Sequence, residues 1–92
     1  MAKKAKLKKA YSDKSFYLQN GELARDLLQL AEEIDAASKD VFEHHVNDER
    51  NDFAAWVEAV FKEKKLAEKL LGIEDKDRYV IELLKFVANQ LK

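Results

Sequence analysis

The stretch "FEHHVNDERNDFAAWV", residues 42 to 57, joins a run of histidines, acids and amides to an apolar segment that carries the tryptophan of the chain. Asparagine and aspartate favour turns and helix caps, because their side chains bond nearby backbone groups. The apolar residues that follow share one helical face: Phe53, Trp56, Val57, Val60 and Phe61. The stretch therefore predicts a helix, a polar corner and a second helix that begins at a cap on Asn51 or Asp52.

The two histidines raise the question of a zinc site. His44 has Asp48 four residues later, a spacing that lets two side chains on one helix hold an ion. His45 has Glu49 in the same relation. No cysteine and no further histidine exist in the sequence to complete the ligand set, so we expect no zinc.

A calcium loop fits the same stretch only in part. Asn47, Glu49 and Asn51 take positions one, three and five of a loop that would end at Glu58. Position six is Asp52 instead of the glycine that makes the sharp turn, and a helical pattern follows it. We therefore expect no calcium and no other cofactor.

A catalytic role needs a nucleophile or a titratable group placed beside a substrate. No serine lies in a nucleophile-elbow context, and the sequence has no glycine-rich phosphate loop. We expect a protein that is not an enzyme. The polar corner is then a structural junction, or alternatively a binding surface, formed by His45, Asn47, Asn51, Asp52 and Trp56.

The remaining sequence also favours helices, since it has no proline and only two glycines. We predict an all-α fold, a compact bundle of four to five short helices. Further helices are expected over 22–37, 62–71 and 76–91, the first capped by Asn20 and the second ended by Gly72. The aromatic segment "SFYLQNG", residues 15 to 21, has no evident strand partner, so we expect an extended chain packed over the helices.

The last predicted helix has an unusually broad apolar arc, which Ile81 and Ala88 widen past ~200° on a 3.6-residue period. One neighbouring layer would not cover it. Either the helix is central in the monomer, or part of it is an interface with a second copy or another protein. The candidate interface residues are Tyr79, Ile81, Phe86 and Ala88.

The chain of 92 residues is long enough for one small domain. We assign residues 1–14 to a basic flexible tail and 15–92 to a single helical domain, with a core at 15–71 and a C-terminal helix at 75–92. The 17 basic and 18 acidic residues nearly cancel. The tail nevertheless concentrates candidate contacts to nucleic-acid phosphates: Lys3, Lys4, Lys6, Lys8 and Lys9. Without cysteine, an export signal or a membrane-length apolar run, we expect a cytoplasmic protein.

The sequence also resembles a small prokaryotic, largely archaeal, all-helical family of unknown function. The resemblance covers residues 15–71 and leaves the tail and the last helix as additions of this chain. It rests on "SFYLQNG", "HHVNDERNDFAAWV" and "LAEKLL", and the matching positions are Phe16, Tyr17, His45, Asn47, Asn51, Asp52, Phe53, Trp56, Leu66 and Ala67. The resemblance implies a compact helical module with a role in interaction, and brings no reaction, substrate or cofactor.

Two functional hypotheses follow from these features. The first is a protein-interaction or assembly module that uses the broad apolar last helix. The second is an accessory nucleic-acid or ribonucleoprotein binder that acts through the lysine-rich tail.

Overall fold

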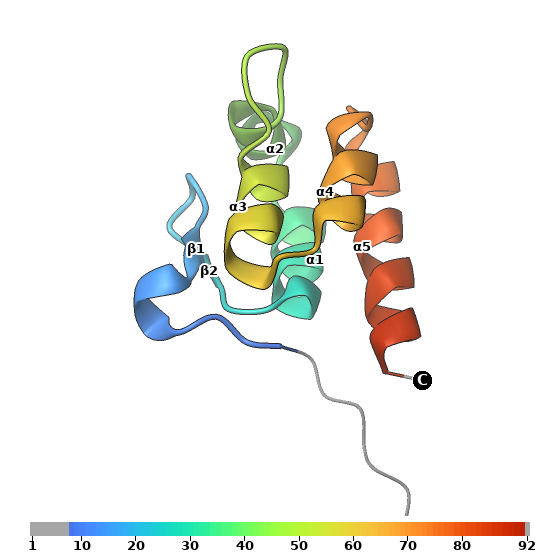
Figure 1. Cartoon of the computed structure of the whole chain (residues 1–92). Coiled ribbons are helices and arrows are strands. Elements are labelled where there is room, and N and C mark those ends of the chain that lie inside the picture. The colour runs from blue at the N-terminus through green and yellow to red at the C-terminus, as the bar shows by residue number, and fades with distance from the viewer. Residues whose placement is uncertain (1–7, 92) are drawn as a thin grey trace, which may run out of the picture.

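Five α-helices and one short antiparallel hairpin make up residues 8–91, the part of the chain that the computed structural model describes (Figure 1). The predicted all-α class and the compact helical bundle are confirmed. In chain order the elements are a 3-10 turn, η1 (Ser12–Lys14), β1 (Phe16–Tyr17), β2 (Leu23–Ala24), α1 (Leu27–Ala36), α2 (Lys39–His45), α3 (Asp52–Phe61), α4 (Lys64–Leu71) and α5 (Lys76–Gln90).

The aromatic segment does have a strand partner, which the sequence analysis missed. β1 pairs antiparallel with β2, so that Phe16 faces Ala24 and Tyr17 faces Leu23. The turn between them uses Gly21, whose φ of 89° lies in the left-handed region that glycine adopts without strain. The Asn-Gly pair thus closes a hairpin instead of leading into a helix.

The first helix consequently begins five residues later than expected, at Leu27 instead of Glu22. Its N-cap is Asp26, not Asn20, and the buried carboxylate accepts the backbone N–H of Gln29 at 2.7 Å. The Gln29 side chain in turn accepts the backbone N–H of Arg25 at 2.8 Å. These bonds resemble a capping box and stabilise the start of α1.

The core lies where the helices meet. α1 packs against α5, α3 packs against α4, and α4 also contacts α5, while the hairpin lies beside α3 on the flank away from α4 (Figure 1). Each helix contributes at least one of the large side chains that are almost completely buried: Leu30, Ile34, Phe42, Phe53, Val57, Leu70, Tyr79 and Leu83. This shared core fixes the relative positions of the polar groups described below.

Residues 8–14, assigned from the sequence to the tail, contact the helical body. The backbone N–H of Ala10 donates to the carbonyl of Arg25 at 2.7 Å, and Ala10 itself is buried. The Nζ of Lys8 lies 3.2 Å from the Glu63 carboxylate. Lys3, Lys4 and Lys6 lie outside the described residues. Within 8–91, no helix combines the length and the apolar character that crossing a membrane requires.

Candidate functional site

His45 lies buried at the corner between α2 and α3, and both of its ring nitrogens have partners. The backbone N–H of Gln19, in the hairpin turn, donates to Nε2 at 2.9 Å. Nδ1 lies 2.9 Å from Oδ2 of Asp52. With Nε2 as the acceptor of the Gln19 N–H, Nδ1 is the ring nitrogen that can donate to the carboxylate. His45 therefore ties the hairpin to the first residue of α3, whereas His44 is exposed.

Asn51 joins three helices at one point. Its Oδ1 accepts the backbone N–H of Ala54 and so caps α3. The same oxygen accepts the Tyr79 hydroxyl of α5 at 2.6 Å. Its Nδ2 donates to the carbonyl of Leu70, in the last turn of α4, at 3.0 Å. Burial raises the pKa of the Tyr79 hydroxyl well above its usual range, and the bond to Asn51 partly offsets that effect.

Asn47 closes the turn between α2 and α3. Its Nδ2 donates to the carbonyl of Glu43 at 2.8 Å, which satisfies a free backbone acceptor at the end of α2. Its backbone N–H donates to the carbonyl of Arg50 at 2.9 Å. Asn47 itself is exposed, so this part of the corner faces solvent.

Trp56 fastens the N-terminal segment to α3. Its indole N–H donates to the carbonyl of Lys14 at 2.7 Å. The indole ring also meets Phe16 edge to face, with ring centroids 5.7 Å apart. Phe16 in turn contacts the ring of His45 at 5.2 Å. Of the five residues predicted at the corner, His45 and Trp56 thus both contact Phe16, Asn51 joins the helix ends, Asp52 binds His45, and Asn47 bonds only within its own turn.

The chemistry available at this corner is that of a structural junction. His45 and Asp52 use their polar atoms to hold the hairpin and α3 together. Nowhere in residues 8–91 do three or more histidine or acidic side chains gather in a way that could hold a metal ion. A groove beside the corner, of about 370 Å³, is lined by residues 46–51 of the turn together with Leu71, Ile73 and Glu74.

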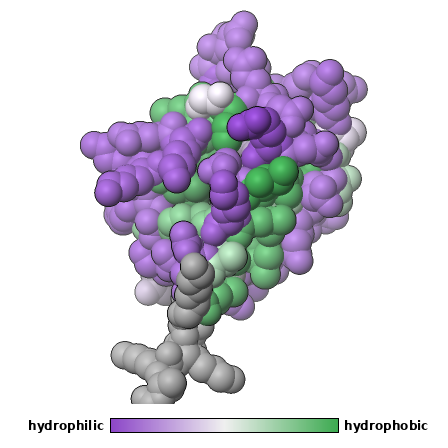
Figure 2. Space-filling model, turned by 90° about the vertical axis from the view of Figure 1, so that its right-hand side faces the viewer, coloured by the Kyte–Doolittle hydropathy of each residue, from purple (hydrophilic) through white to green (hydrophobic). Residues whose placement is uncertain are grey.

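The outward face of α5 is the second candidate. Tyr79 is completely buried and belongs to the core, so it does not form part of any interface. Ile81, Leu84 and Leu91 remain 52%, 41% and 48% exposed. With the exposed Ala88 they recur at spacings of three and four, so they form one apolar stripe along the helix, here called the α5 stripe. Figure 2, which views the molecule from the side of α5, shows hydrophobic surface bordered by hydrophilic side chains.

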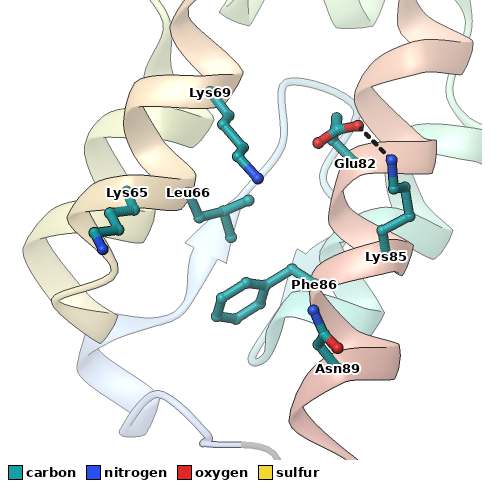
Figure 3. A pocket seen from close by; sticks show the side chains of 7 residues that line it. All are labelled: Lys65, Leu66, Lys69, Glu82, Lys85, Phe86 and Asn89. Carbon is teal, nitrogen blue, oxygen red and sulfur yellow. Dashed lines mark hydrogen bonds and ion pairs between the residues drawn. The ribbon is translucent and has the colours of Figure 1, made fainter.

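A groove runs between α4 and α5 beside this stripe, with a volume of about 210 Å³. Figure 3 shows Leu66 of α4 and Phe86 of α5 pointing toward one another across it. The rest of the lining of this α4–α5 groove is polar: Lys65, Lys69, Glu82, Lys85 and Asn89. The charged residues of the lining are thus three lysines and one glutamate, and Glu82 is paired with Lys85 at 3.4 Å.

Comparison with known proteins identifies the family. A family model described as "Family of unknown function (DUF5752)" matches residues 7–89. That match covers most of the chain. The chain belongs to DUF5752. No curated protein and no solved structure matches it.

The DUF5752 match is longer than the resemblance seen in the sequence. It begins at residue 7 and ends one residue before the end of α5, at Gln90. The last helix is therefore part of the DUF5752 domain. The resemblance over residues 15–71 had suggested that it was an addition, and that interpretation was wrong. The residues that anchor the N-terminal segment lie inside the DUF5752 match, and so do Ile81, Leu84 and Ala88 of the α5 stripe, whereas Leu91 lies beyond it.

Several residues of these surfaces escaped the sequence analysis. Leu84 and Leu91 were not among the candidate interface residues, and Lys65 and Lys69 were not among the candidate binding residues. A seven-residue repeat links Ile81 to Ala88 and Leu84 to Leu91, but the buried Val80 and Val87 have the same spacing, so no local signal separated the stripe from the core.

Proposed function

We propose that this DUF5752 domain is a protein-association module whose α4–α5 face binds an acidic, partly apolar segment of a partner protein. The observation that carries the proposal is the α5 stripe, which stays exposed beside a lysine-rich groove. A binding role, instead of a catalytic one, is also supported by His45, whose two ring nitrogens are used inside the junction.

The apolar part of this face supplies the driving force. Each exposed side chain of the stripe gains roughly 25 cal/mol for every Å² of apolar surface that a partner removes from water. The spacing of Ile81, Leu84 and Ala88 is the one used in helix-to-helix seams. A partner helix with its own apolar stripe fits this pattern.

The charged part of the face supplies the selection of the partner. Lys65 and Lys69 attract acidic side chains, whereas Lys85 and Glu82 are paired with one another at 3.4 Å. A second copy is a poorer occupant. Two copies related by a twofold axis near the middle of the stripe would place Lys85 opposite its own equivalent, and like charges at an interface oppose association.

The experiment uses two synthetic helical peptides and the isotope-labelled full chain. Both peptides carry leucines at spacings of three and four, one with glutamates and the other with lysines at the remaining positions. The glutamate peptide should shift the backbone amide resonances of α4 and α5, and the lysine peptide should not. Ile81→Lys and Lys85→Glu should each weaken binding, while Leu71→Lys should not, because this exposed leucine lines neither the groove nor the stripe.

Two results would contradict the proposal. One is equal binding of the two peptides, or shifts that map away from α4 and α5. The other is a dimer of the wild-type chain in sedimentation that Ile81→Lys abolishes, because the occupant of the face would then be a second copy.

A further inference from the structure

A second groove lies where the N-terminal segment passes the end of α3, and it shares no lining residue with the α4–α5 groove. Its volume is about 360 Å³. It is called here the N-terminal groove, and its lining residues are Lys9, Ala10, Tyr11, Lys14, Ala59, Val60 and Lys62. The sequence separates these residues widely, and docking of the N-terminal segment on α3 brings them together.

The charge of this groove has one sign. Its lining includes Lys9, Lys14 and Lys62 and no acidic residue. The neighbouring Lys8 is used differently, because its Nζ lies 3.2 Å from the Glu63 carboxylate and 3.4 Å from the carbonyl of Phe61. That contact holds the segment against the end of α3 and leaves three other cations around a common space, which favours an anionic ligand.

Tyr11 offers an aromatic ring beside these cations. It is 81% exposed, more than any other large hydrophobic side chain of the described residues. The backbone on both sides of it is anchored, by the bond from Ala10 to the Arg25 carbonyl and by the bond from Trp56 to the Lys14 carbonyl. A free ring on a fixed backbone is suited to stacking against a planar group.

Lys62 lines the groove in an unfavourable backbone conformation. With φ 60° and ψ 28° it adopts the left-handed conformation, alone among the non-glycine residues within 8–91. Glycine or asparagine would take this position with less strain. A lysine here can serve the C-terminal end of α3, whose dipole favours a cation, or it can serve a ligand in the groove. The two roles predict different outcomes for the same substitution.

We propose that the N-terminal groove binds single-stranded nucleic acid, with a base stacked on Tyr11 and backbone phosphates at Lys9, Lys14 and Lys62. Single-strand binding combines a basic groove with an aromatic ring, because each base exposes a flat face once it is unpaired. A duplex hides those faces, so it could use only the charges.

The test titrates the full chain with a fluorescent single-stranded oligonucleotide over a series of salt concentrations. Each phosphate contact to a single strand contributes roughly −0.7 to the slope of log affinity against log salt, so three contacts give a slope of about −2 or steeper. Tyr11→Ala should weaken binding about fivefold or more. A strand of the same length that lacks its bases should bind the wild-type chain as weakly as the complete strand binds Tyr11→Ala.

Lys62→Gly separates the two roles of this lysine. It should make the salt slope shallower by about 0.7 and leave the unfolding temperature unchanged or higher. The matched controls are Tyr17→Ala, another exposed tyrosine, and Lys39→Gln, another exposed lysine, neither of which lines the groove. Both should bind like the wild type.

Four results would overturn the proposal. The first three are no binding at low salt, equal binding of all variants, and equal binding of strands with and without bases. The fourth is a lower unfolding temperature of Lys62→Gly together with an unchanged salt slope. Vesicles of anionic lipid supply the last check. If they bind the chain with the same dependence on Tyr11 and Lys62, the groove receives a membrane surface and the nucleic-acid assignment fails.

Discussion

The hydroxyl of Tyr79 donates a hydrogen bond of 2.6 Å to Oδ1 of Asn51, and so connects the first turn of α5 to the residue that caps α3. Because Asn51 also donates to the carbonyl of Leu70, one amide side chain serves the ends of three helices. Its loss would affect all three at once, which makes it the most informative position for a stability measurement.

Asn51→Ala should therefore lower the free energy of unfolding by more than the loss of an ordinary helix cap does. The variant loses the cap, leaves a buried tyrosine hydroxyl without its partner and removes one hydrogen bond from the Leu70 carbonyl, which keeps the bond from the Ile73 N–H at 3.1 Å, for a total of about 3 kcal/mol. Ser38→Ala, which removes the exposed cap of α2, should cost about 1 kcal/mol. Urea unfolding of both variants makes the comparison, and equal losses would show that Asn51 acts as a cap alone.

His45→Phe should destabilise the chain by about 1 to 2 kcal/mol, although it preserves an aromatic ring. Phenylalanine can keep the contacts to Phe16 and Phe53, but it offers no partner to the Gln19 N–H or to Asp52. His44→Phe changes the exposed neighbour and should stay within about 0.5 kcal/mol of the wild type. Chemical denaturation measures both, and similar losses would mean that packing alone explains His45.

Tyr79 should make the protein sensitive to alkali. Its pKa is raised by burial in the folded state, so above pH ~10 the unfolded chain loses this proton while the folded chain keeps it. The folded state then binds more protons than the unfolded state, and the free energy of unfolding falls as the pH rises. Tyr79→Phe should show a smaller fall between neutral pH and pH ~11 than the wild type or Tyr17→Phe. Parallel curves for all three would contradict this linkage.

Lys62→Gly should leave the free energy of unfolding unchanged or raise it by up to about 1 kcal/mol. The left-handed backbone at this position strains a residue with a Cβ, and glycine relieves that strain. Glycine also raises the conformational entropy of the unfolded chain, which offsets part of this gain in stability. Lys62→Val should lower stability, because a branched Cβ tolerates this conformation least. Thermal unfolding of the pair tests the backbone argument separately from any ligand.

Trp56→Phe should loosen the N-terminal segment before it affects the helices. The variant loses the indole N–H that binds the Lys14 carbonyl but keeps an aromatic ring near Phe61. Limited trypsin digestion should therefore cut faster after Lys14, while cleavage after Lys39 in α2 serves as an internal control. Equal acceleration at both sites would indicate global destabilisation.

The sequence predicted the elements whose signals are local. α3 was recognised from its apolar spacing and from Asn51 as a cap, and α4 from the glycine that follows it. The hairpin was missed because Leu23 and Ala24 also fit the apolar stripe of a helix, and because pairing with Phe16 and Tyr17 depends on the turn at Gly21. The Asp26 and Gln29 pair was the local signal for the true helix start.

The candidate surfaces were harder to predict, for a different physical reason. Tyr79 and Ile81 are both apolar residues of one helix, and only the positions of α1 and α4 decide that the first is buried and the second exposed. The N-terminal groove depends on Tyr11 and Lys62, which the fold brings to one place. Periodicity describes a single element, whereas a groove between elements requires their arrangement.

The docking of residues 8–14 sets an order on folding during synthesis. Lys8 bonds to Glu63 across 55 residues of sequence, and the Lys14 carbonyl accepts the Trp56 indole N–H across 42 residues. The segment leaves the ribosome before these partners do. It must therefore wait for the end of α3 before it can dock, and contacts of such long range close more slowly than the turns of a helix. The segment is thus made before its partners and docks only after they have folded.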